Sequence, residues 1–164
     1  MNGSVSFHPA SPSELEAVWA YNIAAHPGDR RWEAWREDYI ALNRAGLGRT
    51  WVVTVGDEIA GEGTLLFDPS CGAVGGRLAL ADGRTRANLN ALRMKKAYEG
   101  RGLMSGLTKA MEARAKARGF GVMTIGVEEK ERRNRAIYRH WGYVTPLFEV
   151  VEDGERVLYY EKTL

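Results

Sequence analysis

The chain has 164 residues, of which 45% are hydrophobic and 27% charged, and its formal net charge is +2. This composition is that of a soluble globular protein, and the length predicts a single domain over residues 1–164. The only cysteine, Cys71, excludes an internal disulfide and a cysteine-rich zinc site. Because we find neither a secretory signal nor an apolar run of membrane-spanning length, we expect a cytoplasmic protein.

Charge is unevenly distributed along the chain. The segment 86–139 contains 14 Lys and Arg but 5 Asp and Glu, and the remaining residues are acid-rich. A basic segment of this kind suits a polyanionic ligand, although a solvated helix surface gives the same pattern. Nucleic-acid binding is disfavoured, because aromatic residues do not interleave the basic ones.

The first predicted elements are a strand at residues 5–8 and two helices. Ser11 is placed to cap the first helix, with Pro12 at its first position and Glu14 completing a capping box. A second helix is expected over residues 29–45. Both helices carry tryptophans, which either form one wall of a pocket or belong to the core.

The middle of the chain indicates β structure. Residues 50–55 and 59–67 are rich in β-branched and apolar side chains and flank a short polar turn, so we expect a hairpin. A turn-rich loop is expected over residues 68–76. Residues 77–80 are then predicted to form a partial strand.

A strand over residues 88–95, a glycine turn and a helix over residues 103–118 come next. This order places several backbone N–H groups at a helix start, where unpaired donors and the helix dipole bind anions. Gly100 and Gly102 suit the turn, because a side chain there would hold the oxygens of a ligand away from the backbone. The pattern therefore predicts a site for a phosphate-bearing cofactor.

The last predicted elements are a strand, a helix and a hairpin. The strand at residues 122–127 follows the helix 103–118, and such a crossover predicts that it pairs parallel with the strand 88–95. A short helix is expected over residues 134–141. Residues 143–151 and 157–162 form the final hairpin.

The glycine turn admits three kinds of nucleotide site. A P-loop requires Lys followed by Ser or Thr after its last glycine, and the turn has neither. A dinucleotide fingerprint is approached by Gly100, Gly102 and Ser105, with Glu128 as the acid after the next strand. Two lysines separate the strand from the glycines, however, and one crossover is too few for a dinucleotide-binding sheet.

Two further motifs favour the third kind of site. Residues 94–103 match a strand followed by a Pro-Glu-Tyr-Arg-Gly-Arg-Gly-like turn, and residues 134–143 approach the pattern Asn-x-x-Ala-x-x-Tyr-x-x-x-Gly-Phe. From Val52 to its end the chain thus resembles the GNAT superfamily of acetyl-CoA-dependent N-acetyltransferases. Glu99 and Met104 depart from the signature of that family, which has a cationic or amide residue and a small residue at these positions.

The resemblance implies a fold of the α+β, mixed α/β class. Its sheet is mixed and mostly antiparallel, with about seven strands, a parallel and splayed central pair (88–95 and 122–127) and about four helices. It also implies direct transfer of an acetyl group from acetyl-CoA, the co-substrate, to a primary amine of a small molecule or peptide in a ternary complex. No metal is expected. The residues expected to bind acetyl-CoA are Leu92, Met94, Gly100, Arg101, Gly102, Leu103, Met104, Ser105, Asn134 and Tyr138.

Two residues are assigned catalytic roles by the resemblance, and Glu128 is a substitute for the acid that relatives often carry on the strand before the glycine turn. The N–H of Met94 donates to the thioester carbonyl oxygen, and Tyr138 protonates the departing sulfur. Glu128 is the best candidate for the base that deprotonates the amine through water, although a surface acid explains it equally well. His26 is a weaker candidate.

The acceptor amine cannot be identified from the sequence. The acid-rich part of the chain favours a cationic acceptor, and a homodimer is left open. Because Glu99 and Met104 depart from the family signature, a second function also stays open. In this alternative the protein is a catalytically inactive sensor or structural module that binds acyl-CoA.

Overall fold

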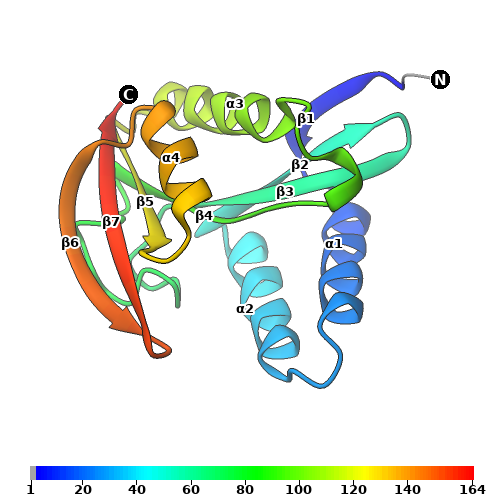
Figure 1. Ribbon diagram of the computed structural model, residues 1–164, viewed down its shortest axis with the longest axis horizontal. Helices are drawn as coiled ribbons and strands as arrows, with labels where there is room; N and C mark the ends of the chain where they lie inside the picture. The colour runs from blue at the N-terminus through cyan, green and yellow to red at the C-terminus, as the bar shows by residue number, and fades with distance from the viewer. Residues whose placement is uncertain (1–2) are drawn as a thin grey trace. The chain divides into compact units, whose positions relative to one another are not determined.

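The computed structural model describes residues 3–164. Its elements are β1 (Val5–Pro9), α1 (Pro12–Ala25), α2 (Arg31–Ala45), β2 (Gly48–Val55), β3 (Glu58–Leu66), β4 (Arg86–Met94), a 3-10 helix η1 (Lys96–Tyr98), α3 (Leu103–Ala117), β5 (Val122–Glu128), α4 (Arg132–His140), β6 (Thr145–Glu152) and β7 (Glu155–Thr163). The strands form a 7-stranded sheet in the order β1-β2-β3-β4-β5-β7-β6 (Figure 1). The predicted α+β fold, with four helices and a mostly antiparallel sheet, is confirmed.

The chain divides into two compact units. The first unit comprises the residues up to Leu65 together with Ala91–Met111, and the second comprises Leu66–Asn90 and Glu112–Leu164. Each unit therefore contains part of β4 and part of α3. Within residues 3–164, no helix combines the length and the apolar character that crossing a membrane requires.

The start of α1 confirms the predicted capping box. Ser11 Oγ accepts a hydrogen bond from the backbone N–H of Glu14 at 3.2 Å, and Glu14 Oε1 accepts one from the backbone N–H of Ser11 at 3.0 Å. Pro12 occupies the first helical position, where its missing N–H costs no helical hydrogen bond. The three local signals agree, and α1 begins where the sequence predicts.

In the first unit, the two faces of β3 differ in character. A Cβ atom on Gly61 would lie 2.7 Å from the carbonyl oxygen of Arg93, and one on Gly63 would lie 2.7 Å from Leu92 Cδ2. These glycines therefore allow β4 to approach closely. Because successive side chains of a strand point to opposite faces, Glu62 points away from this glycine face. Its carboxylate meets Asn22 of α1.

In the second unit, β5 pairs with two neighbours. Its parallel register with β4 runs from Arg86↔Val122 to Leu89↔Ile125. Its antiparallel register with β7 covers the whole strand, from Val122↔Thr163 to Glu128↔Val157. The parallel pairing predicted from the crossover is thus confirmed.

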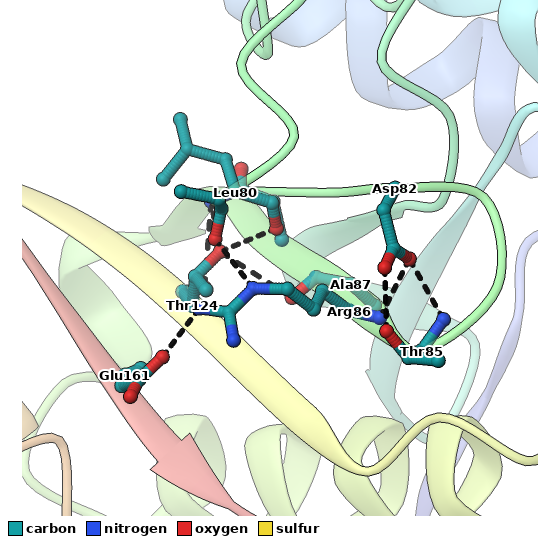
Figure 2. A network of polar contacts seen from close by, with 9 residues as sticks. Leu80, Asp82, Thr85, Arg86, Ala87, Thr124 and Glu161 are labelled. Carbon is teal, nitrogen blue, oxygen red and sulfur yellow. Dashed lines mark hydrogen bonds and ion pairs between the residues drawn. The ribbon is translucent and has the colours of Figure 1, made fainter.

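A polar network fixes the entry into β4 in the second unit (Figure 2). Asp82 Oδ1 accepts hydrogen bonds from the backbone N–H groups of Thr85 at 2.7 Å and Arg86 at 2.9 Å. The Arg86 guanidinium in turn donates to Ala79 O at 2.7 Å and to Glu161. On β5, the Thr124 hydroxyl donates to Leu80 O at 2.8 Å.

The partial strand predicted at residues 77–80 is wrong. Residues 78–80 form a turn, in which Leu80 N donates to Arg77 O at 2.9 Å. The carbonyl groups of Ala79 and Leu80 accept from the Arg86 and Thr124 side chains instead of a neighbouring strand. Side chains from later in the sequence thus replace the backbone partners that a strand would need.

We expect the substitution Asp82→Ala to lower the free energy of unfolding by about 1–2 kcal/mol at neutral pH, as the loss of a capping side chain does. Burial raises the pKa of the Asp82 carboxyl, but hydrogen bonds from Thr85 and from the backbone of Arg86 outweigh it, so the pKa lies below its usual range. This stabilisation is therefore present above the unfolded-state pKa and is lost as the pH falls through the folded-state value. Urea unfolding of the wild-type protein and of Asp82→Ala, at neutral and at acidic pH, measures this difference in the free energy of unfolding. A difference between the two proteins that does not shrink in acid would contradict this assignment.

Candidate active site

The glycine turn of the first unit lies between η1 and α3. Gly100 has a φ of +77° and Gly102 a φ of +73°, a backbone conformation that L side chains rarely adopt. A Cβ atom at either position would meet nothing within 4 Å. The turn therefore requires glycine for its backbone conformation and leaves open space above it.

The backbone N–H groups of this turn are available to a ligand. Within residues 3–164, those of residues 100–105 donate to no protein acceptor, and the first to do so is that of Gly106, which donates to Gly102 O at 3.1 Å. They precede and begin α3, a helix of 15 residues, whose N-terminal end carries a partial positive charge. Arg101 adds a full positive charge and lies over the Tyr98 ring at 5.3 Å. These features fit a diphosphate.

The end of β4 is held against β3 in the first unit. Ala91 has a φ of 54°, which is uncommon for a non-glycine residue and marks a local distortion of the strand. Beyond it, the Leu92 and Met94 side chains lie over the glycine face of β3, and Lys95 N donates to Ala60 O at 2.8 Å. The two hydrophobic residues predicted to bind the cofactor arm thus follow this distortion directly.

A cavity of about 400 Å³ adjoins Met94 in the first unit, between α1, β3 and β4. It contains the most buried carboxylate of the candidate site, Glu62, whose side chain is 5% exposed. Glu62 Oε1 accepts hydrogen bonds from Asn22 Nδ2 at 2.7 Å and from Arg93 Nη1 at 2.8 Å. The cavity thus has an ion pair in its wall.

Aromatic rings hold Arg93 in place. Its guanidinium lies 4.8 Å from the centroid of the Trp32 ring and 5.4 Å from that of the Trp19 ring. Trp19 is 1% exposed and belongs to the core, whereas Trp32 stacks on His26 with ring centroids 3.8 Å apart. Trp19 therefore takes the core role, one of the two that the sequence left open, and His26 packs against Trp32.

Glu62 is not among the site residues predicted from the sequence. Its partners Asn22 and Arg93 lie 40 and 31 residues away in the chain. The signal present in the sequence is an acid between two glycines within the strand now seen as β3. A carboxylate at an inward-facing strand position is rarely buried without a partner, so this pattern indicates a paired group.

In the second unit, Tyr138 lies on α4 and lines a cavity of about 430 Å³. Its ring stacks on Trp141, with centroids 5.5 Å apart. Burial, together with the negative charge of Glu131, raises the pKa of the Tyr138 phenol to about 12. Asn134 lies one helical turn before Tyr138, on the same face of the helix.

Glu128 is the last residue of β5 and is more exposed than Glu62. Its side chain is 41% exposed, and its carboxylate lies 3.7 Å from Lys130 Nζ. Its backbone pairs with Val157 of β7. Its role as the base stays a prediction.

The site residues predicted from the sequence thus fall in both units. The first unit contains Leu92, Met94, Gly100, Arg101, Gly102, Leu103, Met104 and Ser105, and the second contains Glu128, Asn134 and Tyr138. Within residues 3–164, no three His, Cys, Asp or Glu side chains are grouped so that they could hold a metal ion.

The pKa values of the buried tyrosines predict an alkaline transition. Burial raises the pKa of Tyr138 and of Tyr159 to about 12, and that of Tyr143 further. In the unfolded chain these phenols ionise near pH 10. The unfolded state therefore binds fewer protons between about pH 10 and 12, so stability falls as the pH rises through this window. Ultraviolet titration should show these tyrosines ionising together with unfolding; their ionisation near pH 10 in the folded protein would contradict the assignment.

The model of the Acetyltransferase (GNAT) family matches residues 13–143 of the chain. A search of curated proteins finds no match. The family match covers the glycine turn, β5 and α4, and so includes every residue predicted from the sequence to bind or react.

Solved structures share the fold over nearly the whole chain. A protein from Desulfovibrio desulfuricans assigned to the GNAT family is 14% identical, with a TM-score of 0.74 and coverage of 98% of this chain and 99% of that one. RimL, a ribosomal L7/L12 alpha-N-protein acetyltransferase in complex with coenzyme A, is 14% identical, with a TM-score of 0.70 and coverage of 98% and 94%. An acetyltransferase from Salmonella typhimurium that modifies the N-terminal serine of L7/L12 is 14% identical, with a TM-score of 0.71 and coverage of 98% and 95%.

Proposed function

Because this chain belongs to the GNAT acetyltransferase family, we propose that it transfers the acetyl group of acetyl-CoA to a primary amine of a small molecule or a peptide. The observation that carries the proposal is the run of backbone N–H groups at residues 100–105 without a protein acceptor. Amide donors at a helix start suit the diphosphate of a coenzyme A derivative. One of the similar structures contains coenzyme A, which supports this choice of ligand.

In the proposed complex, the glycine turn binds the diphosphate through its backbone. Acetyl-CoA supplies an acetyl group activated as a thioester. Leu92, Met94 and Asn134 hold the arm that carries it, and the Met94 N–H donates to the carbonyl oxygen. A backbone donor aimed at a developing oxyanion stabilises the transition state by about 3–4 kcal/mol.

Tyr138 is proposed to donate a proton to the departing sulfur. A phenol with a pKa of about 12 stays protonated at neutral pH, so the proton is present when the thiolate forms. The base that deprotonates the amine is either Glu128, as predicted from the sequence, or another carboxylate.

The acceptor class follows from the similar structures and from charge. Two of them act on the N-terminus of a ribosomal protein. An N-terminal amine or a small cationic amine is therefore proposed as the acceptor, in agreement with the acid-rich part of the chain outside residues 86–139.

Two measurements on the purified protein test the proposed function. Isothermal titration with acetyl-CoA measures binding, and thiol release with a panel of alkylamines, polyamines and short peptides measures transfer. We expect saturable binding and amine-dependent thiol release. Binding without turnover on every amine would instead support the acyl-CoA sensor, and absence of binding would contradict both functions.

A further inference from the structure

The Glu62 carboxylate in the first unit has one oxygen that is fully engaged and one that is not. Both of its hydrogen bonds, from Asn22 and Arg93, go to Oε1, and no residue within 3–164 donates to Oε2. Burial of an ionised oxygen without a donor is costly, so such an atom normally has a partner. The side chain is 5% exposed, yet Oε2 is not sealed from solvent. The free oxygen therefore opens onto the cavity that Glu62 lines.

The surroundings of this oxygen determine which kind of group it accepts. Arg93 neutralises the charge of the carboxylate from the side of Oε1, at 2.8 Å, and itself lies over the rings of Trp32 and Trp19. These contacts fix the carboxylate in place, so Oε2 has a defined direction. The cavity of about 400 Å³ is large enough for an alkylamine and also contains Met94.

We propose that Glu62 is the residue that receives the acceptor amine in this cavity and takes its proton. This inference rests on the proposed acetyl transfer. It assigns the general base to β3, where neither the sequence nor the family comparison placed it. An ammonium group offers the hydrogen-bond donor that Oε2 lacks, and Met94, whose N–H is proposed to hold the thioester carbonyl, lines the same cavity.

The step balances without any further reagent. An N–H bond of the ammonium breaks and its proton moves to Glu62 Oε2. The nitrogen lone pair then forms the C–N bond with the acetyl carbon while the C–S bond breaks, and the sulfur takes a proton from Tyr138. The acetylated nitrogen is now positively charged, and it loses its second N–H proton to water. Glu62 returns its proton to water through the open cavity, and water reprotonates Tyr138. The net products are the acetylamide, free coenzyme A and one proton.

Arg93 orients the carboxylate that takes this proton, because its guanidinium donates to Oε1 at 2.8 Å. The same guanidinium holds Oε1, so the carboxylate does not rotate when Oε2 binds the proton. Arg93 is therefore a positioning residue in this scheme and does not react.

The substitution Glu62→Gln tests the proposal, because the amide oxygen still accepts from Asn22 and Arg93 while the basic oxygen is lost. The acceptors are the most active alkylamine of the panel and its β,β-difluorinated analogue, compared at a mildly alkaline pH at which the fluorinated amine is largely neutral. We expect kcat/KM of Glu62→Gln to fall about 100-fold for the first acceptor and less than about threefold for the second. A general base contributes about 100-fold or more, but only for an acceptor that must first lose the proton of its ammonium form. The residual activity with the first acceptor should rise with pH up to the pKa of the amine.

A matched control separates this role from a structural one. Glu112→Gln on α3 removes another carboxylate that is mostly buried, 12% exposed and ion-paired with Lys162 at 3.0 Å. Glu112→Gln should lower stability but should not lower kcat/KM more for one acceptor than for the other. If Glu62→Gln lowers kcat/KM equally for both acceptors, or for neither, the inference is overturned. It is also overturned if Glu128→Gln, instead of Glu62→Gln, lowers kcat/KM for the first acceptor alone. A wild-type protein that acetylates no amine would overturn the proposed function as well.

Discussion

Replacing Tyr138 by Phe is expected to lower kcat about 100-fold or more while the affinity for acetyl-CoA stays within about threefold, because a positioned general acid contributes 10²–10⁴-fold. The substitution removes one hydroxyl and retains the ring that stacks on Trp141 with centroids 5.5 Å apart. Because the pKa of Tyr138 is about 12, the wild-type rate should show no decline below pH 10 that arises from this group. Steady-state kinetics and calorimetric titration of both proteins measure the two effects.

Tyr159→Phe provides a matched control for this prediction. Burial also raises the pKa of Tyr159 to about 12, and its hydroxyl donates to Glu152 Oε1 at 2.8 Å. The hydroxyl also accepts from Arg77 Nη2 at 3.3 Å. Its loss should therefore cost about 1–3 kcal/mol of stability, as for two hydrogen bonds, and leave kcat unchanged. If both variants lose kcat equally, the effect is structural and Tyr138 is not the acid.

The features predicted correctly from the sequence are those set by neighbouring residues. The capping box at Ser11 and Glu14 spans three residues, and the glycine turn precedes α3 directly. Each of these signals sets a local backbone conformation that is compatible with the rest of the fold. The crossover from β4 through α3 to β5 then leaves only a parallel pairing, which the register confirms.

The features that the sequence did not reveal depend on distant partners. Residues 78–80 form a turn because the Leu80 carbonyl accepts from Thr124, 44 residues later. In the same way, the environment of Glu62 is created by Asn22 and Arg93, which reach it from α1 and β4. A single sequence does not show such pairings, so the acid that faces a cavity looks like any polar residue of a strand.

Substitution of Gly102 by Ala should weaken acetyl-CoA binding at least about tenfold. The φ of +73° costs an L residue about 1–2 kcal/mol, so the turn shifts toward a conformation in which its N–H groups no longer converge. The new Cβ also projects into open space, where a diphosphate would need to approach the backbone. Calorimetric titration gives the affinity, and thermal unfolding gives the stability loss.

Gly119→Ala separates backbone strain from ligand binding. Gly119 follows α3 in the second unit with a φ of +95°, and a Cβ atom there would also meet nothing within 4 Å. Both variants should therefore lose similar stability, whereas only Gly102→Ala should lose affinity for acetyl-CoA. Equal affinities in the two variants would mean that the N–H groups of residues 100–105 do not hold the diphosphate. In that case the observation that carries the proposed function would need another explanation, since those donors would remain without a partner in the complex.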